Sequence, residues 1–96
     1  MGRSAPNPIA FELGGPITRT DLPGLCERFR ALLETGGVEV ALCDVSGAVP
    51  DGVTIDALAR LQLAAGRHGC RVRLRQPSSE LLELLDFVGL SEALRG

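Results

Sequence analysis

The sequence predicts an α/β fold, in which a small, mixed and largely parallel sheet is flanked by helices. At 96 residues the chain is long enough for one small domain and no second one. Short apolar runs with strand periodicity alternate along it with longer segments of helical periodicity. Such strand–helix alternation is typical of parallel strands joined by right-handed crossovers.

The first element is a strand that follows a polar lead-in. Residues 1–7 are small and polar, and we expect a flexible N-terminal segment there, followed by a single domain at 8–96. In residues 8–13 apolar side chains alternate with others at the period of a half-buried strand. Glycine and proline at 14–16 end this strand, and 16–18 form only a strand stub before the first helix.

A helix and a central strand come next. Apolar residues recur with helical spacing from Leu22 until the glycines at 36–37. Asp21 is expected to cap the first N–H groups of this helix, and Pro23 suits its first turn because proline has no N–H to leave unpaired. Residues 38–45 are almost continuously apolar and too short for a helix, so we expect a central strand that is buried on both faces.

The C-terminal half adds a helix, a strand and a helix. The second helix is closed by Gly69. In 70–75 apolar residues alternate with arginines, which predicts a strand with one wet face. Residues 77–80 open a third helix that ends at Gly89, and 91–94 add a final turn. The buried face of the second helix is expected to comprise Ile55, Leu58, Leu61, Gln62 and Ala65.

Composition excludes several functional classes. The formal net charge is −2, so no overall basic field attracts nucleic acid or an anionic membrane surface. The chain has no Trp and no Tyr, which removes the aromatic platforms on which bases stack. Its basic residues are all arginine, and without lysine no phosphate-binding P-loop can form. We therefore expect no nucleic-acid partner.

The cysteine and hydropathy patterns indicate a reducing, cytoplasmic setting. No apolar stretch approaches the ~20 residues that span a bilayer and no leader pattern is present, so we expect no direct membrane insertion. Cys26, Cys43 and Cys70 lie far apart within apolar patterns, which predicts reduced core residues rather than a disulfide or a metal site. The sole histidine, His68, precedes a helix-ending glycine and is expected to cap the helix in solvent.

The loop at 46–54 is the expected place for a functional site. In parallel sheets, sites form where loops leave the carboxyl ends of strands. Asp44 precedes this loop and Asp51 lies within it, so one alternative is a metal-assisted phosphatase or phosphotransfer protein that uses both carboxylates. A turn role for Asp51 and a first-turn helix role for Asp56 are the simpler interpretations. We therefore expect no catalytic residue, no metal ligand and no cofactor.

Four segments together resemble the STAS domain of anti-sigma factor antagonists. They occur in the family's order and spacing, and the resemblance covers residues 9–95. It implies a STAS-like sheet flanked by helices, and a non-enzymatic module that binds proteins. The segments are Asp44-Val45-Ser46-Gly47, Ile55-Asp56-Ala57-Leu58, Gly69-Cys70-Arg71-Val72-Arg73-Leu74 and Phe87-Val88-Gly89-Leu90.

The resemblance extends to the segment that carries the family's switch, but without its serines. In the family, a partner anti-sigma kinase phosphorylates a serine within an Asp-Ser-Ser-Gly sequence at the start of the second helix. With one residue deleted from the preceding loop, the equivalent segment is Asp51-Gly52-Val53-Thr54, in which both serine positions lack a hydroxyl. Without that deletion Thr54 falls on the second serine. The helix register favours the gapped alignment, so we expect Thr54 to be an unphosphorylated N-cap.

The resemblance also implies a protein partner. The first candidate is an anti-sigma factor with a kinase-like ATPase fold. An alternative role is that of an accessory subunit of an ABC-type lipid transport ATPase, which similar serine-poor STAS domains take. The family usually begins with two strands, whereas this sequence predicts one and a stub. Self-association into a homodimer is one way to cover the trimmed sheet edge.

The partner surface is expected on the outer face of the second helix. At ~100° per residue, Leu63 falls opposite the buried stripe that is centred on Leu58. Leu63 would be the apolar anchor, and charged neighbours would form a rim that sets orientation. The predicted partner-binding residues are Asp51, Gly52, Val53, Thr54, Asp56, Arg60, Leu63 and Arg67.

Overall fold

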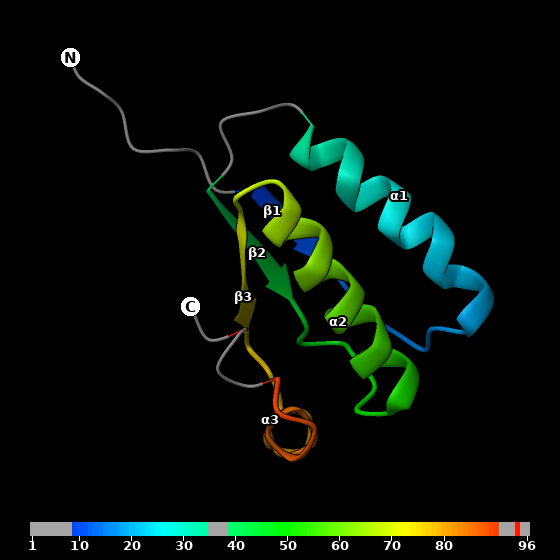
Figure 1. Ribbon diagram of the computed structural model, residues 1–96. Coiled ribbons are helices and arrows are strands. Elements are labelled where there is room, and N and C mark those ends of the chain that lie inside the picture. Colours follow the sequence, from blue (N-terminus) through cyan, green and yellow to red (C-terminus); the bar gives the residue numbers. More distant parts are fainter. Residues whose placement is uncertain (1–8, 35–38, 91–93, 95–96) are drawn as a thin grey trace.

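The computed structural model contains one three-stranded sheet and three α-helices in alternation (Figure 1). It describes residues 9–34, 39–90 and 94. The predicted lead-in at 1–7, the glycines at 36–37 and most of the final turn at 91–94 lie outside these residues. The α/β class and the strand–helix alternation are confirmed, and every strand pair in the described sheet is parallel.

The sheet has the order β1-β2-β3, with β2 in the centre. Strands β1 (Ile9–Glu12), β2 (Val40–Asp44) and β3 (Arg71–Arg75) match the three predicted strands. The register pairs Phe11 of β1 with Cys43 of β2, and Cys43 in turn with Leu74 of β3. Ala41 and Cys43 are fully buried, but Val40 and Leu42 on the opposite face of β2 are only half-buried. The expectation that β2 is buried on both faces therefore holds for one face alone.

The segment between β1 and the first helix differs from the prediction. Residues 16–18 form no strand; instead Gly15 makes a single bridge to Ala48, and a 3-10 turn, η1 (Arg19–Asp21), follows. Helix α1 (Leu22–Leu33) then begins with Pro23 in its first turn. The prediction that Asp21 caps α1 is wrong, because its carboxylate accepts the backbone N–H of Thr18 at 2.9 Å. Asp21 thus closes the turn before the helix.

The remaining helices begin and end close to the predicted signals. Helix α2 (Gly52–Arg67) ends at Gly69, which adopts a φ of +69°. Helix α3 (Ser79–Phe87) is capped by Ser78, whose side chain accepts the N–H of Leu81. Gly89, with a φ of +82°, lets the N–H of Leu90 donate back to the carbonyl of Leu85 at 2.8 Å. No described helix is long and apolar enough to cross a membrane.

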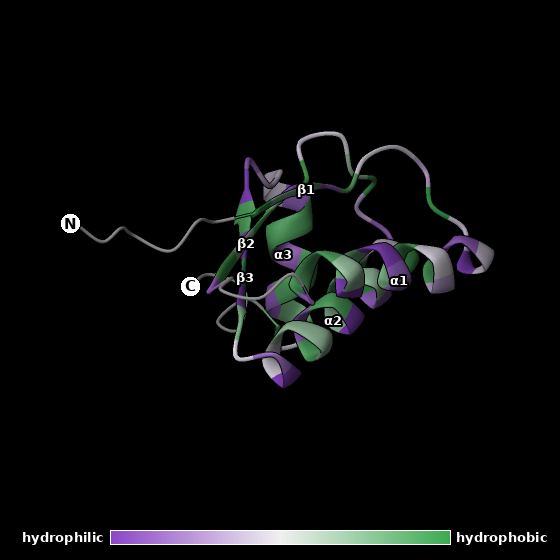
Figure 2. Cartoon of the chain, turned by 90° about the horizontal axis from the view of Figure 1, so that it is seen from above, coloured by the Kyte–Doolittle hydropathy of each residue, from purple (hydrophilic) through white to green (hydrophobic). Residues whose placement is uncertain are grey.

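The core lies between the sheet and the helices. Helices α1 and α2 lie side by side on one face of the sheet, and α3 lies near the carboxyl ends of the strands (Figure 1, Figure 2). Phe11 of β1 meets Phe29 of α1 edge to face, with ring centroids 5.4 Å apart. None of the described helices covers the opposite face of the sheet, where the arginines of β3 are exposed. The largest fully buried side chains are Phe29, Leu22, Leu58, Leu61, Leu81, Leu85 and Leu94.

The three cysteines are free thiols in different environments. Cys43 in β2 is almost completely buried, and burial raises the pKa of its thiol to about 12. Burial also raises the pKa of Cys70 above its usual value. Cys26 on α1 is half-buried. The thiolate is the reactive species. We therefore expect the most buried thiol to react most slowly.

We expect iodoacetamide at pH 8 to modify Cys26 first, Cys70 more slowly and Cys43 only after the chain is unfolded. At a pKa of about 12, roughly one Cys43 thiol in ten thousand is ionised at that pH. Intact-mass analysis followed by peptide mapping gives the order of labelling. Labelling of Cys43 in the native protein as fast as Cys26 would contradict this burial pattern.

Candidate functional site

The candidate site starts where β2 ends. Asp44 accepts the backbone N–H of Ser46 at 2.9 Å, and this hydrogen bond holds the pKa of the Asp44 carboxyl below its usual value. The next residues turn toward β1, because the N–H of Gly15 donates to the carbonyl of Gly47 at 2.8 Å. The loop is thereby fixed at the carboxyl edge of the sheet, where the sequence predicts a functional segment.

The start of α2 is capped by Asp51 and not by Thr54. The side chain of Asp51 accepts the N–H of Thr54 at 2.9 Å. The prediction that Thr54 is the N-cap is wrong, since it lies inside the first turn and is 0% exposed. Its Oγ1 is buried and has no hydrogen-bond partner in the described part of the chain. Of the predicted partner-binding residues, Thr54 is the one whose side chain lies in the core.

The outer ridge of α2, which we define as Asp56, Arg60, Leu63 and Arg67, lies where the helical phase predicts it. Leu63 is 62% exposed, whereas Leu58 is 0% exposed. Asp56 pairs with Arg60 at 3.0 Å and with Arg19 of η1 at 2.9 Å. These contacts hold the pKa of Asp56 below its usual value, and the hydrogen bond from Arg60 has the largest effect. Two of the three predicted rim charges therefore already pair with each other within the chain.

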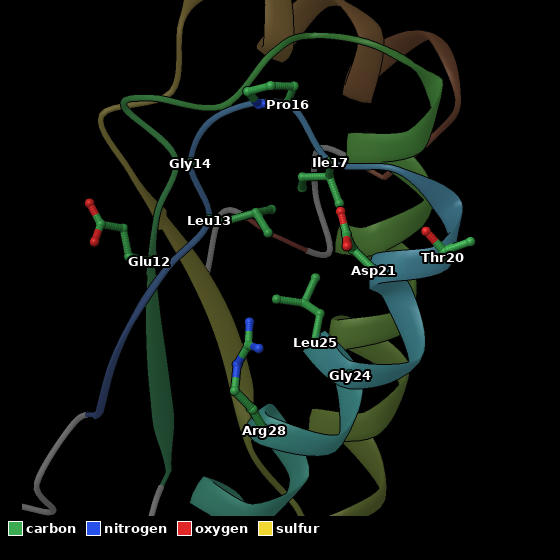
Figure 3. A pocket seen from close by; sticks show the side chains of 10 residues that line it. All are labelled: Glu12, Leu13, Gly14, Pro16, Ile17, Thr20, Asp21, Gly24, Leu25 and Arg28. Carbon is green, nitrogen blue, oxygen red and sulfur yellow. The ribbon is translucent and has the colours of Figure 1, made fainter.

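A hollow of about 350 Å³ lies between the carboxyl end of β1 and the start of α1 (Figure 3). Leu13 and Leu25 contribute buried apolar side chains to it. Glu12, Asp21 and Arg28 also line it, but the Glu12 carboxylate points away from the hollow, so one carboxylate and one guanidinium lie near this space (Figure 3). None of the predicted partner-binding residues lines this hollow.

A second hollow, the α3 groove, adjoins the predicted segment and was missed by the sequence analysis. It has a volume of about 570 Å³. Phe87 of α3 is 88% exposed at this groove, an unusual exposure for a large aromatic side chain. The groove is lined by Pro50, Glu80, Glu83, Leu84 and Phe87.

One signal in the sequence could have revealed the α3 groove. The helical segment from Leu81 to Val88 is apolar at six of eight positions. A short helix that buries one stripe cannot turn all of these side chains into the core. The buried stripe is Leu81 and Leu85, so Phe87 and Val88 remain on the surface. An apolar excess of this kind indicates a second contact face.

The metal-ligating side chains of the described residues are not gathered into a cluster. No group of three or more His, Cys, Asp and Glu comes together in the part of the chain that the structure describes. Asp44 and Asp51 are each engaged in a local backbone hydrogen bond. The ring Nδ1 of His68 lies 3.1 Å from the carbonyl oxygen of Ala64, at the end of α2, as expected for an exposed helix cap.

No protein-family model, curated protein or solved structure matches this chain. The resemblance to STAS domains therefore stays a hypothesis that rests on the residues themselves. Three surface features are the candidate binding sites: the outer ridge of α2, the exposed part of the Asp51–Val53 segment and the α3 groove.

We expect opposite stability effects from two substitutions at the start of α2. Asp51→Ala removes the cap and should lower the free energy of unfolding by about 1 kcal/mol. Thr54→Val replaces an unpaired buried hydroxyl by a methyl group of similar shape and should raise it by about 1 kcal/mol. Chemical denaturation measures both. A loss of stability in Thr54→Val would show that the hydroxyl does have a partner.

We expect Leu63→Glu to melt close to the wild type, because the Leu63 side chain is mostly in solvent. Leu58→Glu should unfold the domain, since an unpaired buried carboxylate costs several kcal/mol, comparable to the net stability of a small domain. Circular dichroism melts compare the two variants. Equal melting temperatures would mean that the observed phase of α2 is wrong.

Proposed function

We propose that this protein is a non-enzymatic regulatory module that binds a protein partner, as the STAS-domain anti-sigma factor antagonists it resembles do. The observation that carries the proposal is the exposure of Phe87, at 88%, over the apolar α3 groove. Exposed aromatic side chains beside apolar pockets are typical anchors of protein interfaces. The groove includes Pro50, the residue directly before Asp51–Val53, where the resembling family meets its partners.

The proposed module lacks the serine phosphoswitch of the family. Gly52 and Val53 have no hydroxyl, and the hydroxyl of Thr54 is buried. A kinase could reach Thr54 only after the first turn of α2 opens, which would also break the Asp51 cap. Binding would then be regulated by the amount of the partner or by the partner's own state, and not by phosphorylation of this chain.

The local hydrogen bonds favour binding over catalysis. A phosphatase that used Asp44 and Asp51 would need both carboxylates to face a common metal ion. Here Asp44 is held by the N–H of Ser46, and Asp51 by the N–H of Thr54. Both aspartates thus have a structural role that explains their presence without a reaction.

The partner we propose is a cytoplasmic anti-sigma factor with a kinase-like ATPase fold. Tagged protein, applied to a lysate of the native cells, should retain such an ATPase, which mass spectrometry would identify. Phe87→Ser should reduce the retained amount about tenfold, because aromatic anchors dominate interface energies. Leu63→Glu, on the outer ridge of α2, should also reduce it.

The matched control is Leu82→Ser, because Leu82 is a partly exposed leucine of the same helix that does not line the groove. It should retain the partner as the wild type does. Equal retention by the wild type and Phe87→Ser would reject the groove as the binding site. Capture of an ABC-type lipid transport ATPase would support the accessory-subunit role instead, and metal-dependent phosphatase activity lost in Asp44→Asn would show an enzyme.

A further inference from the structure

The residues of α3 that line the groove form a single helical stripe. Glu80, Glu83, Leu84 and Phe87 follow the spacing i, i+3, i+4, i+7, which places them on one side of a helix. This stripe is separate from the one that enters the core, Leu81 and Leu85. Two apolar and two acidic side chains therefore share a face of α3, and of the residues that line the groove Pro50 alone comes from outside this helix.

The charge of Glu83 in this stripe is not explained by the stability of α3 itself. The helix contains Glu80, Glu83 and Asp86 and no basic residue. An acid in the first turn is favoured by the helix dipole, but acids nearer the C-terminus oppose it. Like charges three residues apart also repel each other. Glu83 lies outside the first turn, so the dipole does not stabilise its charge, and Glu80 three residues away repels it.

We propose that the α3 groove binds an amphipathic helix of the protein partner, with apolar side chains packed on Leu84, Phe87 and Pro50 and with Lys or Arg side chains paired to Glu80 and Glu83. This inference rests on the proposed function and specifies the chemistry of its partner. Phe87 supplies most of the affinity as the apolar anchor. The two glutamates fix the orientation and raise the association rate.

Charge disfavours a contact in which the grooves of two copies of this chain face each other. A two-fold contact through the groove would place the same patch on both sides. Glu80 and Glu83 of one molecule would then face the same carboxylates of the other, and no residue that lines the groove is basic. A partner with Lys or Arg side chains would instead be attracted to Glu80 and Glu83.

The test uses the whole chain and a synthetic peptide of about 15 residues, long enough to form helix. Its leucines follow the spacing i, i+3, i+4, i+7, and its other positions are lysine. Titration into ¹⁵N-labelled protein should shift the amides of Val49, Asp51 and residues 80–88. A peptide with glutamate in place of every lysine should bind at least tenfold more weakly or not at all.

Variants of the chain separate the two contributions. Phe87→Ser should weaken binding of the leucine–lysine peptide about tenfold. Glu80→Gln with Glu83→Gln should weaken it about fivefold and reduce its dependence on salt concentration. Two controls should bind as the wild type does: Leu82→Ser removes an exposed leucine of α3 that does not line the groove, and Glu34→Gln removes an exposed carboxylate at the end of α1.

Each outcome decides the inference. Shifts at residues 80–88 that depend on Phe87 and on the two glutamates support it. Equal binding of the lysine and glutamate peptides, binding unaffected by Phe87→Ser, or groove amides that shift with protein concentration alone would overturn it.

If the lysine peptide binds the groove but no cellular partner is retained, the proposed function fails and the groove chemistry stands. If a partner is retained through Phe87 but the lysine peptide does not bind, the groove chemistry fails alone.

Discussion

The pairing of β2 on both of its edges is the constraint on which the rest of the structure depends. Because β1 and β3 both run parallel to β2, each connection must return along the sheet, and the returning segments are α1 and α2. Their apolar stripes close the core over Ala41 and Cys43. The same topology brings every carboxyl-terminal loop to one edge of the sheet. The loop after β2, its contact with Gly15 and the start of α2 therefore meet in one place.

Periodicity in the sequence was sufficient to predict the three strands and the three helices, but their buried faces only in part. Ile55 and Gln62, which were expected on the buried face of α2, are half-buried, and Ala57 is buried instead. The alternation in β3 and the helical phase of α2 depend on local spacing alone, so Leu58 and Leu63 could be assigned to the core and to the surface. The caps could not be assigned with the same certainty. Thr18 and Asp21, like Asp51 and Thr54, are pairs of capping residues three positions apart, and either member can accept an N–H. At the start of α2 the acceptor is Asp51, and Thr54 is buried.

The sequence predicted one part of the candidate site, the outer ridge of α2, but not the α3 groove. The outer ridge of α2 can be predicted from the spacing of residues within one helix. The α3 groove also depends on a contact between Pro50 and a helix that begins about thirty residues further along the chain. The spacing of apolar residues does not predict a contact between segments that are far apart in the sequence. The ion pairs show the same limit: Asp56 and Arg60 are one helical turn apart, but Arg19 joins them only through the fold. That contact links η1 to α2.

The exposed arginines of β3 have a consequence for solubility. β3 lies at the edge of the described sheet, and an edge strand offers its free N–H and C=O groups to any other extended chain. Arg71, Arg73 and Arg75 project from the face that no described helix covers. Two such edges brought together would place like charges side by side, which opposes aggregation.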